Sequence, residues 1–300
     1  MYPKQGFLSL KNQGESMTTT IQDSQVESYQ DALDAEGMRW VVPEVVNFLG
    51  QRRATHEAAF FIPHLTPTMR VLDCGCGPGT ITVGLAQIVA QGHVVGIDRE
   101  LAELAQARRY AAQQGIANVE FRVANVYEIP FPDASFDAVL AHAVLQHLSE
   151  PGRALQEMHR VLKPGGIIGV REEDRDGDVI YPLPPRLKQA HELLMRLWSQ
   201  AGGDPYFPKR YRAILREAGF AHIHMTATCE VRSDSASSTM WANALVHFLR
   251  QEPTLAERAI ELGWADRVTV AELVDALQAW GAHPDAFWSE TWCAAVGWKE

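Results

Sequence analysis

The sequence predicts an α/β fold, in which helices cover both faces of a mostly parallel β-sheet. Two observations predict the parallel sheet. An apolar strand at residues 71–73 leads through a glycine-rich turn into a helix, and strand-like and helix-like segments then alternate to residue 232. Such chains return across the sheet through right-handed crossovers, which makes successive strands parallel. A third observation adds a strand of opposite direction, because residues 291–298 form an apolar strand after a long helical stretch.

The residues before the first strand divide into two parts. Residues 1–26 are polar and irregular, so we expect a disordered tail, and they lack the apolar core of a signal peptide. Met17 is an alternative natural start to Met1, and the sequence leaves this choice open. Residues 27–64 carry apolar positions at helical spacing and predict N-terminal helices.

The glycine-rich turn after the first strand carries the strongest functional signal. Gly75, Gly77 and Gly79 lack the Cβ atoms that would stop the backbone from bending tightly against a ligand. A helix begins at Thr80, directly after the turn. This order of strand, glycine turn and helix predicts a nucleoside-containing ligand at the carboxyl edge of the sheet. A dinucleotide site is not expected, since its pattern requires glycine where this chain has Thr80. Asp73, just before the turn, favours a ligand with a cationic end.

The second strand, at residues 93–98, ends in Asp98. A carboxylate at this strand end can accept hydrogen bonds from both ribose hydroxyls of a nucleoside. Arg99 follows directly, and its planar guanidinium can stack on an adenine face; exposure to solvent is the equal alternative. A helix at residues 100–114 is expected to end at Gly115, because glycine is favoured there.

The third and fourth strands, at residues 119–123 and 136–142, bring further polar side chains to the same edge. Asn125 and Val126 follow the third strand, and the amide oxygen of Asn125 can accept a hydrogen bond from an exocyclic amine. His142 ends the fourth strand, where the edge of the sheet faces the ligand.

In order and spacing, these motifs resemble those of the class I S-adenosylmethionine-dependent methyltransferases, in the branch of the ubiquinone/menaquinone-biosynthesis methyltransferases. Residues 71–80 resemble the family's hydrophobic–Asp–x–Gly–x–Gly–x–Gly motif, residues 124–131 its Gly–Asp–Ala–x–x–Leu–Pro–Phe loop, and residues 160–166 the turn before its fifth strand. The resemblance covers about residues 65–232. It implies a Rossmann-like seven-stranded sheet, with S-adenosyl-L-methionine as cofactor and S-adenosyl-L-homocysteine as product.

The resemblance also implies roles for single residues. Asp73 and the glycine turn would hold the methionine end of the cofactor, Asp98 its ribose and Asn125 its adenine edge, although the family usually has aspartate at the last position. Arg99 departs from the small or apolar residue expected after the ribose-binding acid. The expected cofactor-binding residues are Asp73, Gly75, Gly77, Gly79, Thr80, Asp98, Arg99, Asn125, Val126 and His142.

Catalysis requires little covalent help, because a sulfonium is already an excellent leaving group. Most of the acceleration should come from holding the acceptor and the methyl group close and collinear. If the acceptor is a hydroxyl or an amine, a general base removes its proton. The candidates are His142, His147 and Glu172. Two alternatives stay open, in which His142 is satisfied by backbone groups and Glu172 belongs to a solvated acidic loop at residues 171–178.

The predicted domain organisation follows from these segments. Residues 65–232 form the cofactor-binding core, residues 233–285 a helical insertion, and residues 286–300 the last strand of the core sheet. In the resembling family the N-terminal helices cover the cofactor site and such an insertion forms an acceptor lid. The lid candidates for an apolar acceptor pocket are Trp241, Phe248 and Trp280. Ordinary helix packing is the alternative, because apolar residues at helical spacing usually face a core.

Composition limits the classes of function. The formal net charge of −10 disfavours nucleic acid as a partner, because phosphate binding relies on clustered basic residues. The four cysteines show neither a disulfide framework nor zinc spacing, and no metal is expected. No apolar run is long enough to span a bilayer, and we expect a cytoplasmic protein.

We therefore expect a methyltransferase of class EC 2.1.1 that acts on O, N or C of a small-molecule acceptor. The alternatives are an RNA or protein methyltransferase and a non-catalytic cofactor-binding scaffold. The acidic balance argues against the former, and the intact glycine motif argues against the latter. A homodimer is left open.

Overall fold

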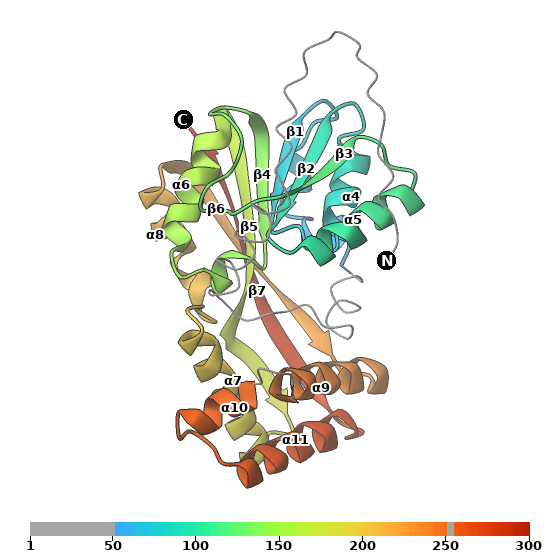
Figure 1. Ribbon diagram of the computed structural model, residues 1–300, viewed down its shortest axis with the longest axis vertical. Coiled ribbons are helices and arrows are strands. Elements are labelled where there is room, and N and C mark those ends of the chain that lie inside the picture. Colours follow the sequence, from blue (N-terminus) through green and yellow to red (C-terminus); the bar gives the residue numbers. More distant parts are fainter. Residues whose placement is uncertain (1–51, 251–254) are drawn as a thin grey trace, which may run out of the picture. The chain divides into compact units, whose positions relative to one another are not determined.

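The computed structural model describes residues 52–250 and 255–300, which are drawn in colour in Figure 1. The disordered tail predicted at residues 1–26 and residues 27–51 of the predicted helical cover lie outside the described residues. No described helix combines the length and the apolar character that a membrane crossing requires.

A single seven-stranded sheet joins the described strands in the order β3-β2-β1-β4-β5-β7-β6. Strands β1 to β5 are parallel where they pair, and β7 runs antiparallel to both β5 and β6. This confirms the predicted Rossmann-like, mostly parallel sheet and its antiparallel last strand. The strands are β1 (Arg70–Cys74), β2 (His93–Asp98), β3 (Val119–Val123), β4 (Phe136–His142), β5 (Leu162–Tyr181), β6 (Phe220–Arg232) and β7 (Phe287–Lys299).

Helices lie on both faces of this sheet (Figure 1). The helix predicted at residues 100–114 is confirmed as α5, and Gly115 after it has a φ of 67°, as the predicted helix end requires. The α-helices are α3 (Ala54–Glu57), α4 (Thr80–Ile88), α5 (Leu101–Gln113), α6 (Pro151–Val161), α7 (Pro185–Gln200), α8 (Tyr211–Glu217), α9 (Ser235–Arg250), α10 (Leu255–Glu261) and α11 (Arg267–Gly281). The 3-10 helices are η1 (Ile62–His64), η2 (Leu145–His147) and η3 (Phe207–Arg210).

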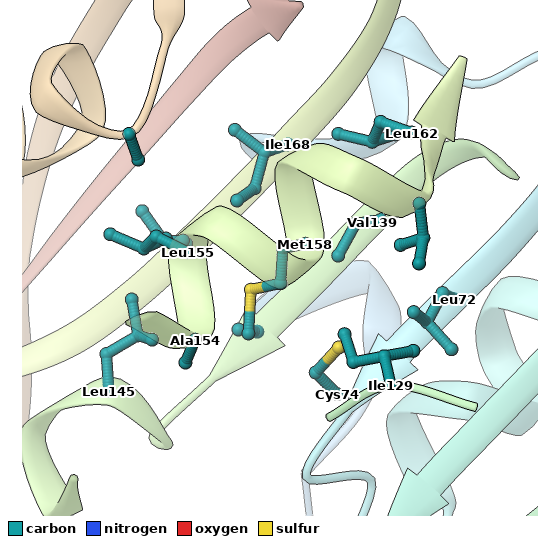
Figure 2. Packing of buried hydrophobic residues seen from close by; sticks show 14 of the residues in the cluster. Leu72, Cys74, Ile129, Val139, Leu145, Ala154, Leu155, Met158, Leu162 and Ile168 are labelled. Carbon is teal, nitrogen blue, oxygen red and sulfur yellow. The ribbon is translucent and has the colours of Figure 1, made fainter. Parts of the chain in front are cut away.

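The central strands are buried on both faces, as expected for parallel strands between two layers of helices. Val71 and its neighbour Leu72 on β1 are both fully buried, and they belong to different core clusters. Val71 shares its cluster with Phe61, on the face covered by α3 and α4. Figure 2 shows the opposite face, where Leu155 and Met158 of α6 pack over the sheet near Leu72. Apolar burial on both faces therefore fixes the register of the strands that carry the site.

A second core lies beside the far ends of β5, β6 and β7. β5 spans 20 residues; it pairs with β4 only as far as Arg171, whereas its pairing with β7 runs from Ile167 to Tyr181. The helices α7, α9, α10 and α11 gather along this extension (Figure 1), and their apolar faces form one cluster around Trp288. α7 precedes β6 in the chain, so this helical region includes more than the insertion predicted at residues 233–285.

The acidic segment at residues 171–178 is a strand, and the predicted solvated loop is wrong. Glu172 is fully buried, and Arg171 is only 4% exposed. Two causes explain the difference: β7 satisfies the backbone of this segment through the pairs from Arg171 to Asp174, and buried arginines balance its acids. Neither the pairing with β7 nor the ion pairs with buried arginines can be recognised from the hydrophobic pattern and the charges of this segment alone.

Candidate active site

The glycine turn between β1 and α4 has a backbone that side chains would not tolerate. Gly75, Gly77 and Gly79 have φ values of 70°, 49° and 77°, in the left-handed region that favours glycine. A Cβ on Gly75 would lie 2.4 Å from Val144 Cγ2, and a Cβ on Gly79 would lie 2.6 Å from Ala107 Cβ. All three predicted glycines are therefore required by conformation, and two of them also by close packing.

Contacts to β2 fix the turn at the carboxyl edge of the sheet. The Gly75 N–H donates to the Ile97 carbonyl at 2.8 Å, and the Gly77 N–H donates to the Asp98 carboxylate at 2.8 Å. Thr80 begins α4 and is 6% exposed. The strand ends that carry the two predicted acids therefore meet at this turn.

Two predicted acids lie at this edge, Asp73 buried and Asp98 half-buried. Asp73 is 2% exposed and accepts a hydrogen bond from Thr82 Oγ1 at 2.6 Å. Burial raises the pKa of Asp73 to about 7; the Thr82 hydroxyl opposes this shift and the Asp98 charge adds to it. Asp98 accepts backbone N–H groups from Gly77 and, at 3.0 Å, from Glu100. Burial raises the pKa of Asp98 as well, despite these two hydrogen bonds.

Glu103 is a further buried acid, which the sequence analysis missed. It lies in the first turn of α5 and is 6% exposed. Burial, together with the charges of Asp98 and Glu100, raises its pKa to about 7. Its Oε2 is buried and has no hydrogen-bond partner within the described part of the chain. An acid in a first helical turn ordinarily complements the helix dipole from solvent, so the sequence gives no signal for this residue.

The buried acids of this edge lack basic partners, and Asp73 in particular favours a ligand that carries positive charge. Among the described residues, neither Asp73 nor Glu103 forms an ion pair with a lysine or an arginine. A buried carboxylate without a partner is costly, and an approaching cation would stabilise its ionised form. The residues present therefore fit S-adenosylmethionine, which carries a sulfonium and an ammonium group.

The predicted adenine-binding loop borders the same strand end. The Ala124 N–H donates to the Asp98 carbonyl at 3.0 Å, which brings Asn125 next to β2. The Asn125 amide oxygen accepts a hydrogen bond from the Tyr127 N–H at 2.9 Å, so one of its two acceptor positions is occupied by a local turn. Val126 is half-buried and packs against the core. The adenine contacts of these two residues stay predictions.

Arg99 is partly exposed beside this loop. Its Nε lies 3.3 Å from the Glu100 carboxylate, and a third of its side chain is accessible. Both predicted alternatives, stacking on adenine and exposure to solvent, are compatible with this position.

A model of the methyltransferase domain matches residues 65–219, just over half of the chain. The chain belongs to the class I S-adenosylmethionine-dependent methyltransferases. An uncharacterized methyltransferase of Schizosaccharomyces pombe is 31% identical over 263 residues, which cover 83% of this chain and 87% of that protein. A ubiquinone/menaquinone biosynthesis C-methyltransferase (UbiE) of Vibrio campbellii is 32% identical over 157 residues, or 52% of this chain and 61% of that protein.

Among solved structures, the YcgJ protein of Bacillus subtilis matches with a TM-score of 0.55 at 17% identity, over 82% of this chain and 98% of that one. This likeness confirms the fold. The family, its branch and S-adenosylmethionine as the cofactor are as the sequence predicted.

In this methyltransferase, His142 is buried in an ionic cluster at the end of β4. Its Nε2 lies 2.9 Å from Arg171 Nη1 and 3.1 Å from the Glu57 carboxylate, and its ring stacks on Trp292 with the centroids 5.2 Å apart. Burial lowers the pKa of His142 to about 4, so the imidazole is neutral at neutral pH. Its contacts are to side chains, and the alternative of a histidine satisfied by backbone groups is wrong.

Arg171 is the centre of this cluster. It donates to Glu57 through Nη1 and to Glu230 at 2.7 Å through Nη2. Although burial alone would raise the pKa of Glu57, its hydrogen bond to His142 and the nearby charges hold it well below its usual range. His56, Glu57 and Glu230 have the proximity of a metal site, with ligand atoms within 4.8 Å of one another. Arg171 is already paired with both acids, however, and a metal ion would lie next to its positive charge, so the cluster does not favour a metal ion.

Glu172 lies on the other face of the sheet and holds the loop after β4. Its Oε1 accepts the backbone N–H groups of Val144 at 3.0 Å and Leu145 at 2.8 Å. Burial raises the pKa of Glu172 to about 8, so the side chain is mostly protonated at neutral pH. Because Val144 is the residue that a Cβ on Gly75 would strike, Glu172 supports the wall of the glycine turn.

His147 is the most accessible of the three predicted catalytic residues. It lies in η2, half-buried, with its ring stacked on Trp198 at 4.9 Å and nearly parallel to it. Burial, then the charges of Arg52, Arg99 and Arg175, lowers the pKa of His147 to about 3. The imidazole is therefore neutral and able to accept a proton only from an acidic donor.

A second buried ionic network lies along the extension of the sheet. Arg175 donates to Glu290 at 2.5 Å and also to Glu173, and Arg232 donates to the other oxygen of Glu290. Both guanidinium groups lie over the Trp241 ring, at 5.6 Å for Arg175 and 4.6 Å for Arg232. No local sequence pattern indicates this network, since its members come from β5, β6 and β7.

Proposed function

We propose that this methyltransferase transfers a methyl group from S-adenosylmethionine to an O, N or C atom of a small-molecule acceptor. The observation that supports this most is the set of buried acids around a glycine turn that has no basic partner of its own among the described residues. The family supports methyl transfer, and the acceptor is our proposal.

The cofactor would supply a methyl group on a sulfonium, and the chain's own residues bind and orient it. Asp73 would face the cationic methionine end. Each carboxylate oxygen of Asp98 accepts one backbone N–H and retains an acceptor position for a ribose hydroxyl. Because the leaving group needs no acid, the main task of these residues is to hold the cofactor in line with the acceptor.

The proposed acceptor site lies between this edge and the second core around β5 and β7. Trp241 supports it, because its ring combines an apolar face with the two guanidinium groups above it. Trp280 is better explained by packing: it is 2% exposed, and its indole N–H donates to the Tyr181 carbonyl at 3.1 Å. We propose that the lid comprises α7 in addition to residues 233–285, with Phe248 and Trp241 as the lining candidates.

His147 is our candidate for a general base, because His142 and Glu172 are engaged in buried contacts and serve better as positioning residues. A base with so low a pKa would accept a hydrogen bond from a hydroxyl acceptor and take up its proton only as the new bond to the methyl group forms, when that proton becomes strongly acidic.

Calorimetry with S-adenosylmethionine, S-adenosylhomocysteine and NADH tests the proposed function. We expect the first two ligands to bind and NADH not to bind; binding of NADH alone would refute the proposal. Methyl transfer is then measured on a panel of phenols, amines and carbon acids. Turnover only on RNA or protein would favour one alternative, and cofactor binding without any turnover would favour a scaffold. A cytoplasmic location and a homodimer stay predictions.

A further inference from the structure

We propose that Glu103 is a further cofactor-binding residue, which contacts the adenosine half of S-adenosylmethionine as a neutral carboxylic acid. The inference rests on the proposed function and assigns a residue outside the predicted motifs.

The position of Glu103 at the glycine turn is the first argument. A Cβ built on Gly77 would lie 4.0 Å from Glu103 Oε2, so this oxygen faces the bare side of that glycine. The Gly77 N–H donates to the Asp98 carboxylate at 2.8 Å. The Glu103 and Asp98 carboxyl groups therefore flank the same residue of the turn, one from α5 and the other from the end of β2.

The missing partner of Glu103 is the second argument. The side chain is 6% exposed, and its Oε2 is buried without a hydrogen-bond partner in the part of the chain that the structure describes. Buried polar atoms in native proteins are almost always satisfied, and leaving one unsatisfied costs folding free energy. A ligand group that reaches the turn would satisfy this oxygen.

The surroundings of Glu103 favour its neutral form. Asp98 at the end of β2 and Glu100 at the start of α5 repel its negative charge, and Arg99, between these two acids in the chain, pairs with Glu100. A neutral carboxyl group has one donor and one acceptor. The edge of adenine offers the complementary pair, an amino donor beside a ring nitrogen that accepts.

The adenine loop gives the third argument, because it lacks a carboxylate. Asn125 stands where the resembling family usually has an acid, and its amide oxygen already accepts the Tyr127 N–H at 2.9 Å. Ala124 is hydrogen-bonded to the Asp98 carbonyl, so the loop and Glu103 border the same strand end. Glu103 would supply from α5 the carboxyl group that the loop does not provide.

The test is calorimetry on the full chain with two probes, S-adenosylhomocysteine and 5′-methylthioadenosine, the latter of which has the nucleoside without the amino acid. Glu103→Leu should weaken the binding of both probes by about 3- to 10-fold, which corresponds to the loss of one hydrogen bond. The matched control is Glu261→Leu, an exposed helical glutamate on α10, and it should leave both affinities unchanged.

A second variant, Glu103→Gln, tests the protonation state, because its amide mimics the neutral acid. At pH 6 the wild type and E103Q should bind S-adenosylhomocysteine about equally, whereas at pH 8.5 the wild type should bind about 5-fold more weakly. Asp73 also titrates near neutral pH, and the ratio of the two proteins at each pH removes its contribution.

The possible results distinguish the parts of the proposal. Unchanged affinity of E103L for both probes would overturn the proposal. A loss limited to S-adenosylhomocysteine would move the contact to the amino-acid end and overturn the assignment to adenosine. A ratio that does not change with pH would overturn the neutral form. If the wild type binds neither probe, the proposed function itself fails, which no result on the variants alone can cause.

Discussion

The two ends of the site carry buried charge in different ways. At the cofactor edge, Asp73 and Glu103 are buried without a described basic partner, and the pKa of each is raised to about 7. Along the extension of the sheet, Glu173 and Glu290 are buried just as deeply, but Arg175 donates to both. The two regions therefore differ in the partners of their buried acids and not in every pKa, because burial raises the pKa of Glu173 to about 7 as well.

The comparison indicates whether a buried charged residue contributes mainly to folding or mainly to ligand binding. Acids that pair with a buried arginine become buried charges without a partner when that arginine is removed, so its replacement should affect folding most. Acids buried without a basic partner can gain one from the bound ligand, a cation at Asp73 and a hydrogen-bonding group at Glu103, so their removal should affect binding most. Three predictions test whether this difference holds.

Replacement of Arg175 should have the largest effect, and it should act on stability. Arg175→Leu leaves Glu173, Asp178 and Glu290 buried without this cation, so we expect the free energy of unfolding to fall by about 3–5 kcal/mol. Urea unfolding measures it. The control is Arg186→Leu, which breaks an exposed pair with Glu272 and should cost about 1 kcal/mol or less. An equal loss of unfolding free energy in both variants would mean that the buried network stabilises the fold no more than an exposed ion pair does.

Replacement of Asp98 should act on binding. Asp98→Ala removes the acceptor for the ribose hydroxyls, so affinity for S-adenosylhomocysteine should fall by about 1.5–3 kcal/mol for each hydrogen bond lost. Calorimetry measures it, with Asp133→Ala as the control because that side chain is exposed at a distant turn. An affinity like that of the wild type would remove Asp98 from the site.

Replacement of Asp73 should give the smallest effect, and it should depend on pH. The pKa of Asp73 is about 7 in the folded protein, above the roughly 3.9 of an unfolded chain. Its stabilising contribution is therefore complete below about pH 3.9 and is lost as the pH rises through 7. Asp73→Asn does not titrate, so between pH 5 and pH 7 its stability relative to the wild type should rise by about 2 kcal/mol without cofactor.

Urea unfolding at the two pH values measures the Asp73 effect. A saturating concentration of S-adenosylmethionine should reduce it, because the cation favours the ionised carboxylate. A stability difference that is the same at pH 5 and pH 7 would show that Asp73 is ionised throughout, and the contrast between the two regions would lose its main support.

The sequence alone determined the local units of this protein. The turn with Gly75, Gly77 and Gly79 could be recognised because positive φ values and close contacts to Val144 and Ala107 restrict those positions to glycine. The strand ends that carry Asp73, Asp98 and His142 could be recognised because a parallel sheet needs short apolar strands that end at one edge. The glycine turn and the apolar strands can both be recognised because each is encoded by residues that are adjacent in the sequence.

Only the tertiary structure decided which charges are buried and what they contact. The charged residues from Arg171 to Arg175 predict a segment exposed to solvent. In the structure, β7, more than a hundred residues further along the chain, covers this segment through strand pairing and through the hydrogen bond between Arg175 and Glu290. Glu103 was likewise hidden, because the core of α5 and the charge of Asp98 reach it from separate elements. Local patterns fix strands, turns and helices, whereas burial and charge balance depend on residues that the fold alone brings together.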